Sequence, residues 1–451
     1  MFKRKIYSKL IEWKNNYASE KALLIEGARR IGKSTIVEEF AKKEYKSYIL
    51  IDFNDASDIV FEAFNKYLND LDTFFMILST EYNVELYDND SLIIFDEVQR
   101  FPKARQSIKK LVKDGRFHYI ETGSLVSIQE NVQDITIPSE EQSIKMFPMD
   151  FEEFCVALGE NKLLEYIKTC YKKKVALADD FHHKAMLLFK QYMLVGGMPK
   201  VVDTYIENNR SFVKADKEKR DILTLYKNDI SKADTKYRTK VKSIFEQIPS
   251  FLSMHEKRVR LSNIQENANF PMYQDTFYWL KTSMMTNQCF LCNDPNVGLS
   301  LNEDRTFIKC YMGDTGLLIS LAFQESELAD GMLYKNILHD DLSINEGMLF
   351  ENVISQILVS NGYNLYFYTH YNQDMHRNDM KIDFIISNGS KLKPKIYPIE
   401  VKSSKKYTTK SITTFMGKYH DRIGETYIIH PKNFKVEDGI TYIPAYMAFC
   451  L

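Results

Sequence analysis

The clearest chemistry in the sequence lies in a glycine-rich segment near the N-terminus. An apolar run at 22–25 leads into Gly27, and the spacing G-x-x-x-x-G-K-S brings in Gly32, Lys33 and Ser34. The glycines permit the positive backbone angles that turn consecutive amides inward, the lysine suits the β and γ phosphates of ATP, and the serine hydroxyl suits Mg²⁺. The helix expected to follow adds its N-terminal dipole. The segment predicts an ATP-binding loop made of Gly27, Ala28, Arg29, Arg30, Ile31, Gly32, Lys33, Ser34 and Thr35.

Two carboxylates follow a second apolar run. Residues 91–95 predict a buried strand, and Asp96 and Glu97 come directly after it. At the end of such a strand Asp96 can hold Mg²⁺ beside the loop serine, directly or through water, and Glu97 is the candidate base that polarises the attacking water. The next expected strand ends in Thr122 and Ser124. One of these hydroxyls either orients that water as part of the ATP site or caps a helix.

A second set of polar residues lies near the C-terminus. Asp383 comes early in an expected strand at 381–387, and Glu400 and Lys402 close another at 396–402. Because side chains alternate along a strand, the acid and the amine share one face and can meet Asp383. The carboxylates would bind Mg²⁺ or Mn²⁺ to activate water, and the lysine would stabilise a pentavalent phosphorane. Glu351, on an expected helix at 345–360, is a further candidate metal ligand. The alternative is that these groups are solvated strand ends.

The elements that must position these groups alternate between strand and helix in the first third of the chain. Apolar runs predict strands at 22–25, 48–53, 91–95 and 117–121, and helical spacing predicts helices at 3–15 and 59–81. Such alternation predicts a parallel sheet covered on both faces, as in a P-loop ATPase domain. Polar groups at the strand ends then meet at one edge.

The rest of the chain predicts further domains. We place an ATPase domain at 1–145, a helical domain at 146–232, a winged-helix-like domain at 233–306 and an α/β domain at 307–451. Asp150 is the expected N-cap of the helical domain, and the segment 196–199 (G-G-M-P) predicts a helix break. Expected helices at 237–253, 261–268 and 272–282 precede an apolar run at 284–292 that would form the wing. This middle region either contacts the DNA backbone through Lys257, Arg258, Arg260 and Lys281 or packs between domains.

Composition excludes several classes of protein. The 451 residues carry 60 basic and 61 acidic side chains, so no global field attracts nucleic acid or anionic membrane. No apolar run reaches the length of a membrane span, so we expect a cytoplasmic protein without a membrane partner. Six cysteines do not form a disulfide framework. The pair Cys289 and Cys292 has metal-ligand spacing, and the alternative is two buried thiols.

Three segments together resemble a known family. The segments 27–35, 91–99 and 121–124 look like the prokaryotic AAA+-type ATPases whose loop reads G-x-R-x-x-G-K-[ST]. The segments 146–154, 196–199 and 311–318 resemble the uncharacterised C-terminal portion of that family. The D…E-x-K residues resemble PD-(D/E)xK nucleases in order and strand setting. The resemblance implies ATP binding and hydrolysis, with a nuclease-like fold at the end of the chain.

These observations lead to one hypothesis and two alternatives. The leading hypothesis is an ATP-driven protein that acts on DNA or RNA, in which hydrolysis gates a metal-dependent nuclease. The first alternative is a signalling or scaffold ATPase whose nuclease-like end is inactive and binds a protein partner, and the second is a small-molecule or nucleotide kinase. A homo-oligomer is left open, because no single arginine among Arg29, Arg30, Arg100, Arg105 and Arg116 is selected as an arginine finger.

Overall fold

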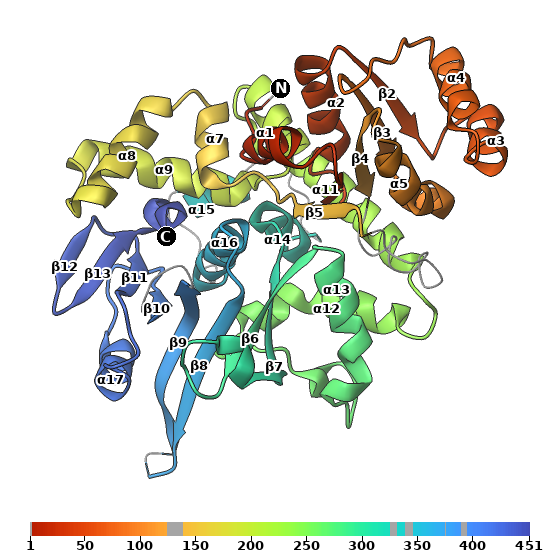
Figure 1. Cartoon of the computed structure of the whole chain (residues 1–451). Helices are drawn as coiled ribbons and strands as arrows, with labels where there is room; N and C mark the ends of the chain where they lie inside the picture. Colours follow the sequence, from red (N-terminus) through yellow and green to blue (C-terminus); the bar gives the residue numbers. More distant parts are fainter. Residues whose placement is uncertain (1, 124–138, 325–331, 339–345, 375, 389–394) are drawn as a thin grey trace. The chain divides into compact units, whose positions relative to one another are not determined.

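The computed structural model describes residues 2–123, 139–324, 332–338, 346–374, 376–388 and 395–451 (Figure 1). The chain divides into two units, residues 1–147 and 148–451, and each is described by itself. No helix within the described ranges is both long and apolar enough to span a bilayer.

A five-stranded parallel sheet forms the centre of the first unit (Figure 1). Its strand order is β2-β3-β4-β1-β5, and every neighbouring pair is parallel. The strands are β1 (Ala22–Glu26), β2 (Ser47–Asp52), β3 (Ser91–Asp96), β4 (His118–Gly123) and β5 (Glu141–Lys145). The helices are α1 (Ile6–Asn16), α2 (Lys33–Glu44), α3 (Asp58–Lys66), α4 (Leu71–Tyr82), the 3₁₀ turn η1 (Val98–Arg100) and α5 (Pro102–Asp114). The predicted parallel α/β sheet is therefore confirmed.

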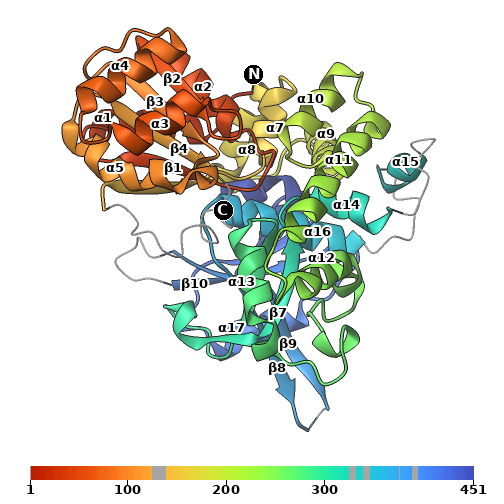
Figure 2. The same ribbon diagram turned by 90° about the vertical axis from the view of Figure 1, so that its right-hand side faces the viewer.

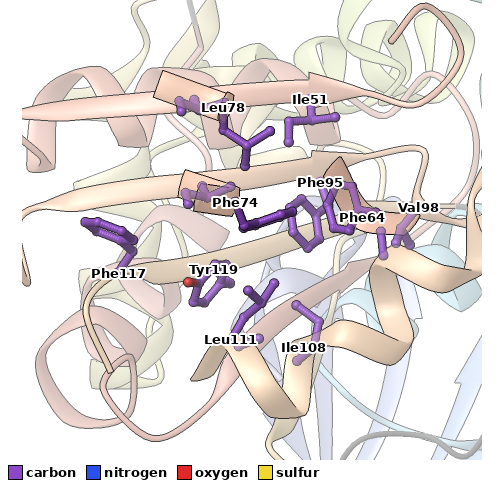
Figure 3. Close-up of a cluster of buried hydrophobic side chains, with 14 of the residues drawn as sticks. Ile51, Phe64, Phe74, Leu78, Phe95, Val98, Ile108, Leu111, Phe117 and Tyr119 are labelled. Carbon is purple, nitrogen blue, oxygen red and sulfur yellow. The ribbon is translucent and has the colours of Figure 1, made fainter. Parts of the chain in front are cut away.

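The core of this sheet is rich in aromatic side chains (Figure 3). Phe95 projects from the inner strand β3 and packs edge-to-face with Phe64 of α3, with ring centroids 5.6 Å apart. Phe64 makes a similar contact with Phe74 of α4 at 5.0 Å. Such contacts add to the hydrophobic burial of each ring. They fix α3 and α4 against the same strand that presents Asp96 at its end.

One strand of the first unit, β5, lacks the continuous apolar run that marks the other strands of the sheet. The edge strand β5 reads E-Q-S-I-K and contains a single apolar residue, Ile144. It pairs with β1 along its whole length, so backbone hydrogen bonds rather than side-chain burial define it. The predicted helix at 59–81 also differs, because it is two helices separated near Asp70, whose carboxylate caps α4 at Thr73 N.

The second unit joins a helical layer to an eight-stranded mixed sheet. Its helices are α7 (Phe151–Ala157), α8 (Asn161–Lys173), α9 (Asp179–Val195), α10 (Pro199–Glu207), α11 (Phe212–Ser231), α12 (Arg238–Ser253), α13 (Gln274–Thr282), α14 (Thr315–Ala322), α15 (Met332–Leu338), α16 (Glu346–Ser360) and α17 (Lys410–Lys418). Short 3₁₀ helices are η2 (Leu261–Asn263), η3 (Phe270–Tyr273), η4 (Leu299–Asn302) and η5 (Ala445–Cys450). Asp150 caps α7 in a capping box with Glu153, which confirms the predicted N-cap.

The sheet of the second unit runs β12-β13-β11-β10-β9-β8-β6-β7. Its strands are β6 (Thr286–Cys292), β7 (Glu303–Met312), β8 (Leu365–Asn372), β9 (Arg377–Asn388), β10 (Lys395–Val401), β11 (Thr426–His430), β12 (Lys435–Glu437) and β13 (Ile440–Pro444). In both views the β8–β9 hairpin extends beyond the other strands of this sheet (Figure 2).

The winged-helix expectation for residues 233–306 was wrong in its wing. The run at 284–292 forms β6, which pairs with β7 on one side and with β8 on the other. An apolar strand buried on both faces belongs inside a sheet, not in an exposed wing. The helix expected at 261–268 is only the 3₁₀ turn η2. The expected domain boundary at 306/307 falls within β7. The eight-stranded sheet contains strands from both sides of that boundary.

Two glycine-containing segments of the second unit meet at Asp314. Helix α9 ends at Val195, and Gly196 has a φ of 84°, so the predicted helix break at 196–199 is confirmed. The Asp314 carboxylate accepts a hydrogen bond from Gly197 N at 2.6 Å and caps α14 at Leu317 N at 3.0 Å. A β-carbon at Gly196 would lie 2.2 Å from this carboxylate, so only glycine fits.

Candidate functional sites

The phosphate-binding loop has the expected backbone turn, but its two glycines serve different purposes. Gly32 has a φ of 89° and stands at the N-terminus of α2. Gly27 does not have a positive φ. A β-carbon there would lie 2.3 Å from Ile31 Cδ1 and 2.6 Å from Met146 O. Our expectation of a positive angle at Gly27 was therefore wrong, because Gly27 allows close backbone approach while Arg30, at a φ of 69°, supplies the second turn.

Lys33 lies across this loop. Its ammonium donates hydrogen bonds to Gly27 O at 2.9 Å and to Ala28 O at 3.0 Å, and the residue is buried at the start of α2. The amine therefore stands inside the turn that would surround a phosphate group. Thr35, the last residue of the predicted loop, is exposed.

Asp96 brings the loop and the central strands together. Ser34 Oγ donates to Asp96 Oδ1 at 2.9 Å, and Thr122 Oγ1 donates to the same oxygen. This convergence follows from the sheet order, because β4 lies between β1 and β3 and presents Thr122 beside the end of each. Hydroxyl and carboxylate oxygens are the ligands that Mg²⁺ prefers, so these residues fit that ion. Ser124, the other candidate hydroxyl, lies outside the described residues.

Glu97 stands beside this group in an unusual backbone conformation. Its φ is 54°, in the left-handed region that non-glycine residues seldom adopt. The buried Gln99 donates from Nε2 to Glu97 Oε2 at 2.5 Å. Gln99 is not predicted from the sequence as part of this site, and its hydrogen bond fixes the direction of the Glu97 carboxylate.

Arg4 is a second residue beside this site that is not predicted from the sequence. Its guanidinium donates to Ile31 O at 3.0 Å and to Phe147 O at 2.6 Å, so the N-terminal segment supports the loop from behind. A cavity of about 630 Å³ opens beside it between α1 and α2. Its lining residues are Phe2, Lys3, Arg4, Tyr7, Ile36, Glu39 and Lys43.

The C-terminal residues also converge as their spacing predicts. Strands β9 and β10 are antiparallel with Ile399 opposite Phe384, which places Asp383 beside Glu400. Asp383 Oδ2 accepts a hydrogen bond from Val401 N at 3.0 Å, and Lys402 Nζ lies 2.8 Å from Glu400 Oε2. Burial raises the pKa of Glu400, although the Lys402 ammonium acts in the opposite direction.

Glu351 is buried among lysines. Its Oε1 accepts hydrogen bonds from Lys309 Nζ at 2.7 Å and from the Tyr311 hydroxyl, and its Oε2 pairs with Lys257. Lys309 Nζ also lies 3.7 Å from Asp383 Oδ1. Burial alone would raise the pKa of Glu351, but the two ammonium groups outweigh it and hold that pKa well below its usual range. We call these groups the acid–lysine cluster: Glu351, Asp383, Glu400, Lys257, Lys309 and Lys402.

A three-carboxylate metal site is not assembled in this cluster. Across the ranges that the structure describes, no group of three or more His, Cys, Asp or Glu side chains is placed to hold a metal ion. The expectation that Glu351 is a metal ligand was wrong in this arrangement, because lysine ammonium groups and a tyrosine hydroxyl take both of its oxygens. Glu400 is a buried carboxylate whose charge is offset by the Lys402 ammonium, and Ser411 lies within hydrogen-bonding reach of it. Cys289 and Cys292 are two buried thiols on β6.

Sequence comparisons divide the chain into three regions. Residues 19–155 match a family described as an AAA domain. Residues 186–328 and 346–447 match two families described as domains of unknown function, DUF8612 and DUF4143. No curated protein matches the chain.

Two solved structures illustrate how distant the structural likeness is. One is described as a closed-state reconstruction of Hsp104 with ATPγS and casein, at 14% identity and a TM-score of 0.29 over 63% of this chain and 50% of that chain. The other is PCH-2 of C. elegans, at 12% identity and a TM-score of 0.18 over 39% of this chain and 46% of that chain. The chain thus spans half or less of each protein's length, and likenesses this low carry no argument about function.

The matched family, the sheet order and the loop geometry agree on the N-terminal region. The matched region begins before β1 and includes the phosphate-binding loop and Asp96. Residues 19–155 are thus similar to AAA domains over the region that holds the loop and Asp96, and this similarity supports ATP binding and hydrolysis.

Proposed function

We propose that this protein is a Mg²⁺-dependent ATPase whose site is formed by Lys33, Ser34, Asp96 and Glu97. The observation that carries the proposal is the convergence of the Ser34 and Thr122 hydroxyls on one oxygen of Asp96. Bound Mg²⁺ would neutralise charge on the β and γ phosphates. Ser34 and Asp96 would hold that ion. Lys33 would give up its hydrogen bonds to the loop carbonyls and donate to phosphate oxygens instead. Glu97, held by Gln99, would orient the attacking water.

The cavity beside α1 is our candidate site for the nucleoside. The cavity borders Ile36, which lies on α2 close to the loop residue Ser34 in the sequence. Phe2 and Tyr7 also line it, and their aromatic rings could stack against the nucleotide base. Lys3 and Lys43 add positive charge at its rim. A nucleotide with its phosphates at the loop would then contact the N-terminal segment that Arg4 fixes.

Steady-state ATP hydrolysis tests this proposal. Lys33→Ala should lower kcat/KM at least 100-fold, because the ammonium stabilises charge that develops on the phosphates. Phe2→Ala should raise KM several-fold with little change in kcat, because it contributes binding but no chemistry. Lys42→Ala is the matched control, since Lys42 lies on the same helix, is exposed and pairs with Glu38. Wild-type hydrolysis in Lys33→Ala would refute the proposal.

A second candidate function belongs to the acid–lysine cluster. We propose that Asp383, Glu400 and Lys402 form a metal-dependent nuclease site acting on DNA or RNA. Support comes from their meeting at neighbouring strand ends, with Asp383 beside Glu400 and Lys402 Nζ 2.8 Å from Glu400 Oε2. The site would bind a divalent cation between the two acids, with Lys402 placed to contact the phosphate.

Cleavage assays separate this function from the scaffold alternative. Single- and double-stranded DNA and RNA would be incubated with Mg²⁺ or Mn²⁺, with and without ATP. Cleavage that Lys402→Ala removes would support the nuclease. Absence of cleavage by a protein that still hydrolyses ATP would favour a scaffold that binds a protein partner.

A further inference from the structure

Two residues with left-handed backbone angles flank Ile31 in the phosphate-binding loop. Arg30 has a φ of 69° and Gly32 a φ of 89°. The Ile31 side chain is buried against Gly27, where a β-carbon would lie 2.3 Å from Ile31 Cδ1. A left-handed backbone is unfavourable for a residue with a β-carbon, so the turn at Arg30 needs contacts that hold it.

Arg4 supplies such a contact from outside the loop. Its guanidinium donates from Nη1 to Ile31 O at 3.0 Å. Because a trans peptide is planar, its carbonyl and its N–H point in opposite directions. Holding Ile31 O therefore also fixes the direction of Gly32 N–H, which points away from Arg4. Backbone amides turned in this way bind phosphate oxygens in loops of this kind, so Arg4 acts on the phosphate-binding face from the opposite side.

Arg4 is itself fixed by a second carbonyl. Its Nη2 donates to Phe147 O at 2.6 Å. The preceding residue, Met146, donates from its backbone N to Glu26 O at 2.8 Å, and its own carbonyl closes the space beside Gly27. The segment that holds Arg4 is therefore bonded to the end of β1, the strand that leads into the loop. A planar guanidinium held by two carbonyls has a defined orientation, so it can hold the loop in one shape.

We propose that Arg4 is a positioning residue of the ATP site, which holds the loop in its phosphate-binding shape before the nucleotide arrives. This inference rests on the proposed ATPase function and adds a residue that preorganises its site. Arg4 acts through the Ile31–Gly32 peptide and touches no reacting atom. Without Arg4 the loop would have to become ordered as the phosphates bind, and this ordering would weaken their binding.

Inorganic tripolyphosphate tests this role, because it has the phosphates of ATP without the nucleoside. The distinction matters, since Arg4 also lines the cavity proposed for the nucleoside. Calorimetric titrations of the full-length chain with Mg²⁺ and either ATP or tripolyphosphate would use a Glu97→Gln background, which lacks the candidate base. Arg4→Met keeps the apolar stem and removes the donors, and it should weaken binding of both ligands about tenfold, by the same factor. Phe2→Ala should weaken binding of ATP alone. Lys9→Ala is the matched control, because Lys9 is exposed on α1.

Steady-state kinetics separates positioning from a general loss of structure. In the otherwise wild-type chain, Arg4→Met should raise KM for ATP about tenfold and leave kcat within about twofold, because bound phosphates order the loop at saturation. A loss of folded protein would instead lower kcat. Arg4→Lys keeps a cationic donor and should show a smaller loss of affinity for both ligands, which keeps the test decisive if Arg4→Met does not fold.

Two results would overturn this role of Arg4. One is equal affinity for tripolyphosphate in Arg4→Met and the background, with circular dichroism showing that both are folded. The other is a loss of affinity confined to ATP, because Arg4 would then contact the nucleoside. Failure of the proposed ATPase is a separate outcome: the background protein would then bind neither ligand, whereas failure of this inference alone leaves its affinity for both intact.

Discussion

His430 shows how a single buried side chain sets the response of the second unit to pH. The imidazole ends β11 and is fully buried. Nδ1 lies 2.6 Å from the Tyr407 hydroxyl and Nε2 lies 3.2 Å from Asn433 O, so the neutral ring can accept one hydrogen bond and donate the other. Burial lowers its pKa to about 4, and Lys432, Lys435 and His182 act in the same direction.

The resulting prediction concerns acid stability. Between pH 6.5 and pH 4 the unfolded chain binds a proton at this position and the folded chain does not, so the free energy of unfolding should fall as the pH falls through that window. The loss should be on the order of 3 kcal/mol. Urea titrations at several pH values would measure it. His430→Gln should reduce the fall in the free energy of unfolding between pH 6.5 and pH 4. The same substitution at the exposed His420 should leave that fall unchanged. An unchanged fall in His430→Gln would contradict the prediction.

At the scale of elements, Asp314 joins α14, α16 and the turn between α9 and α10. Its carboxylate caps α14, holds the Gly197 amide between α9 and α10, and accepts from Gln356 Nε2 of α16 at 3.3 Å. Asp314 is 2% exposed, so water cannot take over as the hydrogen-bond acceptor for these amides if the carboxylate is lost. One side chain therefore fixes the junction of segments that lie far apart in the sequence.

Loss of this junction should be costly. Asp314→Ala should lower the free energy of unfolding by about 2–4 kcal/mol, because buried donors are left without partners. Chemical denaturation would measure the change. Asp304→Ala is the control, since the Asp304 carboxylate bonds the nearby Thr306 in the exposed first part of β7 and its loss should cost about 1 kcal/mol or less. An equal loss of unfolding free energy in the two variants would show that the hydrogen bonds of Asp314 stabilise the protein no more than those of Asp304.

At the scale of the whole chain, the two units carry chemically separate sites. The phosphate-binding loop lies in residues 1–147, and the acid–lysine cluster lies in residues 148–451. Acidic and basic residues nearly cancel overall, with a net charge of -1, so any binding of nucleic acid must depend on local groups. Ligands specific to each site should then stabilise the unit that holds it.

Nucleotide binding should be visible as stabilisation of the first unit. ATP with Mg²⁺ at 100 times its Kd should add about 2.7 kcal/mol to the free energy of unfolding, and should slow hydrogen exchange in residues 22–36. Lys33→Ala should remove both effects, whereas Lys257→Met should retain them. Hydrogen exchange followed by mass spectrometry resolves the two units. Protection that persists in Lys33→Ala would place the nucleotide elsewhere.

The sequence by itself determined the features whose signals are local. The loop motif, the carboxylates after β3, the cap at Asp150 and the helix break at 196–199 each depend on residues a few positions apart, and the structure has all four. Central strands were also predictable, because burial on both faces requires a continuous apolar run.

Only the tertiary structure decided the features that depend on distant partners. The edge strand β5 is polar and exists because β1 offers it hydrogen bonds. Gly27 is needed because Met146 approaches it, not because its own backbone turns. Glu351 has the residue type of a metal ligand, but Lys257 and Lys309 reach it from 94 and 42 residues away. Residue type and spacing fix which chemistry is possible, whereas the identity of the counter-charge depends on which distant segments the fold brings together.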